Sequence, residues 1–144
     1  MTLADIYAEV DALLAPFECD GTAECCTFSN TGREPYPTAI ELAEVERAIA
    51  AKGGPRAAMG KKRLPLADRR CPLLSEDGKC SIYASRPFGC RTYFCHRVRG
   101  PGKLPRKELR ALGARIADLS AKAFPRDPGP RPLSNALSKT LSRH

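Results

Sequence analysis

Residues 71–96 read CPLLSEDGKCSIYASRPFGCRTYFCH, and this stretch carries four of the seven cysteines of the 144-residue chain. Two short apolar runs, 71–74 and 80–83, flank the polar run SEDGK, which is typical of a turn. The pattern predicts a small β-hairpin. Residues 86–96 follow, and the Arg-Pro pair at their start predicts a turn that leads into a short helix. The four cysteines are therefore expected on short, irregular elements.

The other three cysteines lie upstream in the loop-like segment 19–26, CDGTAECC. Thiolates are strong ligands for zinc and iron, and about four of them complete one site. Clustered cysteines in a reducing compartment more often bind metal than form disulfides, and the odd number argues against a complete disulfide framework. The predicted metal ligands are therefore Cys19, Cys25, Cys26, Cys71, Cys80, Cys90 and Cys95, with His96 as a lesser candidate.

The spacing of the cysteines leaves the choice of metal open. Only Cys90 and Cys95 have the C-x2-4-C spacing of zinc sites, whereas the ligands of an iron–sulfur cluster can come from widely separated loops. Adjacent Cys25 and Cys26 point to opposite sides of an extended chain, which leaves room for a second metal or a spare thiol. Zinc and an iron–sulfur cluster, including the 4Fe-4S type, are both compatible with these intervals.

These motifs together resemble the YkgJ-type, or CxxCxxCC, cysteine-cluster family. The resemblance covers about residues 19–95 and rests on four motifs: C-x5-C-C at 19–26, Cys-Pro at 71–72, GKCSIY at 78–83, and R-P-x-x-C-R-x-Y-x-C at 86–95. It implies a domain that chelates zinc or iron. A weaker similarity to a cysteine-cluster flagellin lysine methylase with an iron–sulfur centre places the cluster ahead of zinc. The family's second cysteine falls on Thr22, so either this ligand is dispensable or the site differs from that of its relatives.

Two arginines, Arg86 and Arg91, flank Cys90. Positive charge beside thiolates stabilises an anionic ligand set, so both are predicted to be cofactor-binding residues, with ordinary surface charge as the alternative. No catalytic residue is assigned. The adjacency of Cys95 and His96 does not bring their side chains together, and the chain has no C-x-x-C redox motif.

Three longer helices are predicted outside the cysteine-rich segments. An apolar helical period runs through residues 2–15 with Thr2 as the N-cap. A second helix is expected over residues 39–52, where Thr38 and Glu41 have capping-box spacing, and a third over 106–123.

The expected fold class is mainly α with a small β-hairpin, in a small irregular domain stabilised by metal. Residues 53–70 are rich in glycine, proline and basic residues and are expected to form an exposed connection. We expect a single cysteine-cluster domain over residues 1–124. A loosely ordered, basic, proline-rich segment is expected over 125–144.

The net charge of +8 is concentrated at the C-terminal end. Residues 1–96 hold 12 basic and 13 acidic residues, whereas residues 97–144 hold 12 basic and 3 acidic ones. This basic region suggests an alternative function, a zinc-stabilised module that binds a nucleic acid or a protein. A metal-dependent enzyme of unknown substrate is a second alternative. The absence of a run of about 20 apolar residues argues against a membrane span, and the early acidic residues argue against a secretory signal, so a cytoplasmic location is expected.

Overall fold

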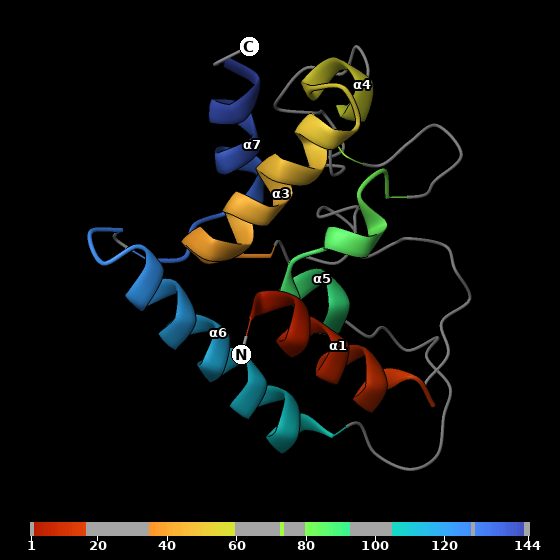
Figure 1. Ribbon diagram of the computed structural model, residues 1–144, viewed down its shortest axis with the longest axis vertical. Helices are drawn as coiled ribbons and strands as arrows, with labels where there is room; N and C mark the ends of the chain where they lie inside the picture. Colours follow the sequence, from red (N-terminus) through yellow and green to blue (C-terminus); the bar gives the residue numbers. More distant parts are fainter. Residues whose placement is uncertain are drawn as a thin grey trace.

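The computed structural model describes residues 2–16, 35–59, 73, 80–92, 105–127 and 129–142. These residues are mainly helical and contain no strand, which confirms the predicted mainly α class. Figure 1 shows α1 and α6 in one half of the molecule and α3, α4 and α7 in the other. The elements are α1 (Leu3–Leu14), α3 (Ala39–Ala51), α4 (Pro55–Met59), η2 (Tyr83–Ser85), α5 (Phe88–Thr92), α6 (Arg106–Ala123) and α7 (Leu133–Ser142).

Local capping explains where two of the long helices begin. The Thr2 amide donates to the Asp5 carboxylate at 2.9 Å, and the Asp5 amide donates to the Thr2 hydroxyl oxygen at 3.2 Å. Each of the two side chains accepts a hydrogen bond from the backbone amide of the other residue. Both amides would otherwise be unpaired in the first turn. At the start of α3, the amide and the hydroxyl of Thr38 both donate to Oε1 of Glu41, at 3.2 and 3.1 Å. The predicted caps of α1 and α3 are therefore confirmed.

The first hydrophobic cluster joins α1 to α6. Buried aliphatic side chains from the two helices face each other, since both carry their apolar residues on a single stripe. The members with the least exposure are Ile6, Val10 and Ile116. The N-terminal turn of α3 is joined to the same half, because the Ile40 amide donates to the Ser120 hydroxyl of α6 at 3.1 Å.

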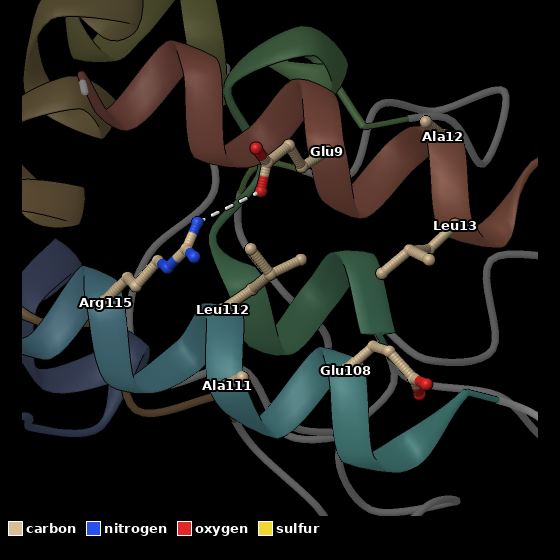
Figure 2. A pocket seen from close by; sticks show the side chains of 7 residues that line it. All are labelled: Glu9, Ala12, Leu13, Glu108, Ala111, Leu112 and Arg115. Atoms are coloured by element: carbon tan, nitrogen blue, oxygen red, sulfur yellow. Dashed lines mark hydrogen bonds and ion pairs between the residues drawn. The ribbon is translucent and has the colours of Figure 1, made fainter.

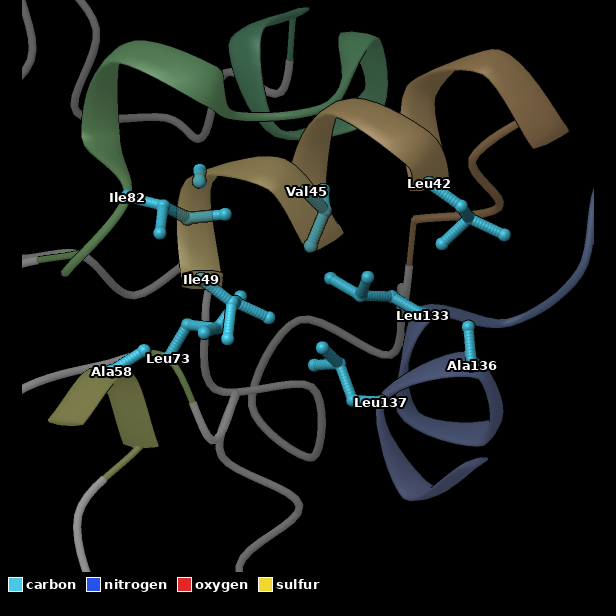
Figure 3. Packing of buried hydrophobic residues seen from close by; sticks show 10 residues of the cluster. Leu42, Val45, Ile49, Ala58, Leu73, Ile82, Leu133, Ala136 and Leu137 are labelled. Carbon is cyan, nitrogen blue, oxygen red and sulfur yellow. The ribbon is translucent and has the colours of Figure 1, made fainter. Parts of the chain in front are cut away.

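The second hydrophobic cluster joins α3 to α7. In Figure 3, Leu133 and Leu137 of α7 point toward the face of α3 that carries Val45 and Ile49. Leu133 and Leu137 are each 1% exposed. Residues 133–142 thus form a helix that packs on α3. The expectation of a loosely ordered segment over 125–144 stays a prediction. The placing of a domain boundary at residue 124 stays a prediction.

The predicted β-hairpin is wrong for the residues that the structure describes. The Ser81 amide does donate to the Leu73 carbonyl at 2.8 Å, as a cross-strand bond would. Beyond Ile82, however, the chain winds into η2, where Ser85 and Arg86 donate back to the carbonyls of Ile82 and Tyr83. The backbone groups after Ile82 are therefore satisfied locally instead of across a ladder.

Residues 53–59 also differ from the exposed connection expected there. Gly53 and Gly54 end α3 with φ angles of 108° and 106°, a conformation that glycine adopts without strain. The short helix α4 follows at once, and its Ala58 is buried in the second hydrophobic cluster. Residues 60–70 lie outside the described residues. None of the helices in the described ranges is long and apolar enough to cross a bilayer.

Candidate metal centre

Two of the seven predicted ligands, Cys80 and Cys90, lie in the part of the chain that the structure describes. Both side chains are half-buried, and both belong to the segment 80–92. The remaining candidates lie outside the described residues: Cys19, Cys25, Cys26, Cys71, Cys95 and His96. Among described residues alone, no group of three or more His, Cys, Asp and Glu side chains could hold a metal ion.

Cys80 begins this segment at the edge of the second hydrophobic cluster, against which it packs. Its neighbour Ile82 is 4% exposed in that cluster. Ser81 lies between Cys80 and Ile82 in the chain. Its hydroxyl oxygen is buried and has no hydrogen-bond partner within the described structure. A buried hydroxyl without a partner costs about 1–3 kcal/mol. It is therefore a group that an additional acceptor beside Cys80 would stabilise.

Cys90 lies on α5, a five-residue helix that is wedged between other elements. The Phe88 ring packs against α6 at Gly113, where a Cβ atom would lie 3.1 Å from the ring. On the other side, a Cβ on Gly89 would lie 2.9 Å from the Cβ of Pro35. The Thr92 hydroxyl donates to the Phe88 carbonyl at 2.9 Å. Packing and local bonds thus fix α5 on several sides and leave the Cys90 thiol half-buried.

Arg91 is the most constrained charged group of this segment, with a side chain that is 3% exposed. Its Nε donates to the Arg86 carbonyl at 2.7 Å, and its Nη2 donates to the Ala84 carbonyl. Its Nη1 donates to both carboxylate oxygens of Asp11 on α1, at 3.0 and 2.8 Å. A buried guanidinium requires such acceptors because loss of water around it is costly.

A buried tyrosine and a buried glutamate continue this network. The Arg91 guanidinium lies over the Tyr7 ring, 3.9 Å from its centroid, in a cation–π contact. The Tyr7 hydroxyl donates to Oε2 of Glu41 at 2.8 Å, and the Phe88 amide donates to the same oxygen at 2.6 Å. Burial, followed by the Glu41 charge, raises the pKa of Tyr7 far above its ordinary range. Tyr7 therefore remains a phenol that donates to Glu41.

Arg86 has a different, more exposed environment. Its Nε donates to the Tyr83 carbonyl at 2.9 Å, and its guanidinium lies 3.8 Å from the centroid of the Tyr83 ring. The contacts of both arginines that the structure gives are thus to protein groups. Their predicted role beside a cofactor stays a prediction.

Tyr7 and Asp11 are not among the functional residues that the sequence predicts, and Glu41 is predicted only as a helix cap. These residues are 34 and 80 positions away in the chain from the groups that they bind. One signal was present: Arg91 follows a predicted ligand in a segment of small and apolar residues, so a buried position would require an acid from elsewhere.

A groove lies on the surface between α1 and α6. Figure 2 shows its lining residues, among them Glu9 of α1 and Arg115 of α6, which form an exposed ion pair at 3.5 Å. Among the described residues that line this groove there is no cysteine or histidine.

The described residues thus form a helical protein in which buried side chains bind a short segment that carries two cysteines. The chain belongs to the CxxCxxCC family, whose model carries the description "Putative zinc- or iron-chelating domain" and matches residues 18–110. All seven cysteines lie within the matched residues, whereas α1 and α7 lie outside them. No curated protein and no solved structure matches the chain.

Proposed function

We propose that this protein binds an iron–sulfur cluster through its clustered cysteines, with zinc as the second choice of metal. The observation that carries the proposal is the family match, because the matched residues include every cysteine of the chain. The proposed ligands are chosen from Cys19, Cys25, Cys26, Cys71, Cys80, Cys90 and Cys95, about four for each site. The metal would serve a structural or a redox role.

The described residues fit a thiolate-bound metal. Cys80 and Cys90 are half-buried, which limits the access of water to a centre that they would bind. The buried Ser81 hydroxyl beside Cys80 lacks an acceptor among the described residues, and thiolate sulfur accepts such hydrogen bonds.

Thiolate ligands persist in reducing conditions, so a cytoplasmic location is part of this proposal. A protein or nucleic-acid partner for the basic C-terminal region stays a prediction from charge alone.

The test is elemental analysis and visible absorption of protein purified without air. We expect iron together with acid-labile sulfide, and a coloured protein that bleaches on exposure to oxygen. Stoichiometric zinc in a colourless protein would reverse the order of the two metals and retain chelation. A protein that holds neither metal at meaningful occupancy, even after incubation with each, would contradict the proposal.

A further inference from the structure

Helix α1 lies outside the residues that the family model matches, yet it supplies two side chains to the segment that carries Cys80 and Cys90. We propose that Asp11 and Tyr7 of α1 position these two cysteines for the metal centre by holding the Arg91 guanidinium. The inference rests on the proposed function. Asp11 and Tyr7 are positioning residues here, since they act through Arg91.

The Arg91 side chain binds the stretch of chain between the two cysteines. Its guanidinium binds the carbonyls of Ala84 and Arg86, and both of these residues lie between Cys80 and Cys90 in the chain. The backbone amide of Arg91 also donates to the Pro87 carbonyl at 3.0 Å. The Arg91 side chain therefore closes the turn that separates Cys80 from Cys90. The distance between the two thiols depends on where this side chain lies.

Helix α1 determines where the guanidinium lies. Asp11 binds Nη1 with both carboxylate oxygens, and the Tyr7 ring covers one face of the guanidinium. Tyr7 is itself held by Glu41, which also binds the Phe88 amide at the start of α5. Helix α5 is thus connected to α1 at two residues. Arg91 contacts Asp11 and Tyr7 directly, and Phe88 is linked to Tyr7 through Glu41.

Helix α1 is a firm support. Ile6 and Val10, which flank Tyr7 on the buried face of α1, are 2% and 0% exposed in the cluster with α6. Tight packing of this kind resists displacement. The position of Asp11 and Tyr7 is therefore set by the α1–α6 contact, independently of any bound metal.

The matched pair of variants for testing this proposal is Asp11→Asn and Glu9→Gln in the full-length chain. Both are half-exposed acids of α1, with side chains 53% and 47% exposed, and each binds an arginine. Asp11 binds Arg91, which follows Cys90 in the chain, whereas Glu9 binds Arg115 of α6 (Figure 2). The comparison separates positioning of the cysteines from general loss of an ion pair on α1.

Two measurements are made on each variant. The first is titration with Co²⁺ as the probe metal, followed by its thiolate-to-metal absorption. The second is the rate at which iodoacetamide alkylates Cys80 and Cys90 in metal-free protein, read by mass analysis of the two peptides. For Asp11→Asn we expect Co²⁺ affinity to fall by about 10-fold to 100-fold, as is usual for groups that orient ligands. We also expect altered alkylation rates at both cysteines and partial rescue by Asp11→Glu.

Glu9→Gln should match the wild type in both measurements. If the wild type binds Co²⁺ and Asp11→Asn is indistinguishable from Glu9→Gln in affinity, absorption and alkylation, the positioning role is overturned and the proposed function stands. If the wild type binds no metal but only Asp11→Asn alters alkylation at the two cysteines, positioning stands and the proposed function fails. Should Asp11→Asn lose its helical circular dichroism, Arg91→Lys, which keeps the charge but lacks the planar guanidinium, decides by the same criteria.

Discussion

A side chain at Gly89 of α5 would collide with another part of the chain. A Cβ at this position would lie 2.9 Å from Cβ and 3.3 Å from Cα of Pro35, and neither atom belongs to a flexible side chain. We expect Gly89→Ala to lower the free energy of unfolding by about 1–3 kcal/mol, because the added methyl overpacks the contact. Urea unfolding followed by circular dichroism measures this.

Gly113→Ala is the comparison for this prediction. The added methyl would meet the Phe88 ring at 3.1 Å, and a side chain can shift more readily than backbone. Alanine also gains about 1 kcal/mol of helix propensity in α6, so the net effect at Gly113 should be smaller than at Gly89. Equal stability of Gly89→Ala and the wild type would show that Pro35 yields freely, contrary to this account.

Glu44 of α3 links stability to pH. Hydrogen bonds from Arg47, and then from Ser85, lower the pKa of Glu44 below its ordinary value. A carboxylate whose pKa is lower in the folded state stabilises the fold above its unfolded pKa of about 4.3, and this contribution is lost as the pH falls through the folded pKa. We expect Glu44→Gln to lose about 0.5–1 kcal/mol of unfolding free energy at neutral pH, and to lose less than the wild type on acidification.

Denaturant unfolding of the two proteins from neutral pH to about pH 3 tests this. Ser85→Ala removes one of the two hydrogen-bonding partners and should remove part of the same pH dependence. Parallel stability curves for the wild type and Glu44→Gln would contradict the assignment to Glu44.

At the scale of single elements, substitution of a buried residue of α7 is expected to lower the free energy of unfolding strongly. Leu137 is 1% exposed in the second hydrophobic cluster, whereas Asn135 of the same helix is exposed. We expect Leu137→Ala to cost about 2–5 kcal/mol of unfolding free energy, because it leaves a cavity against α3. Asn135→Ala should change it by less than about 0.5 kcal/mol. Similar values for the two variants in urea unfolding would mean that α7 does not pack on α3.

The bounds of α1, α3 and α6 could be predicted because their signals are local. Thr2 with Asp5 and Thr38 with Glu41 are three residues apart, and the apolar stripes of α1 and α6 repeat within each helix. Helix α7 gave a weaker signal, since it follows a proline-rich stretch. Its order depends on Leu133 and Leu137 meeting α3, which is a contact between distant parts of the chain.

The residues of the candidate site also divide into those that the sequence indicates and those that only the fold identifies. Cysteines and flanking arginines are visible in a sequence because their chemistry is specific to the residue type. The acceptors of Arg91 are not, since Asp11 is an ordinary half-exposed acid of α1 until the fold brings it to the guanidinium. The hairpin was predicted from two apolar runs, but Ile82 is buried by a turn into η2 instead of by strand pairing.

At the scale of the whole molecule, two hydrophobic clusters join the helices that the structure describes. The α1–α6 cluster and the α3–α7 cluster are both built from described apolar side chains. We therefore expect chelation of the proposed metal to leave these helices folded while the segment 80–92 loosens. Amide hydrogen exchange should show protection lost in residues 80–92 and retained in α6.

The control for this prediction is the same protein reloaded with metal, which should regain protection in residues 80–92. Collapse of protection in α6 on chelation would instead mean that metal binding and folding of the whole chain are one process. Unchanged protection in 80–92 would mean that the buried contacts of Arg91 hold the segment by themselves.

The pairing of α1 with α6 has a consequence for the order of events during translation. Glu9 and Arg115 are 106 residues apart, and Ser120, which binds the Ile40 amide, follows that residue by 80. Every cysteine precedes residue 96, so all seven are added to the chain before α6 is synthesised. Chains are made at about 5–20 residues per second and ordered from the N-terminus. The α1–α6 contact that sets the position of Asp11 and Tyr7 therefore forms seconds after Cys80 and Cys90 have been added to the chain, so the proposed positioning of these two cysteines is a late event.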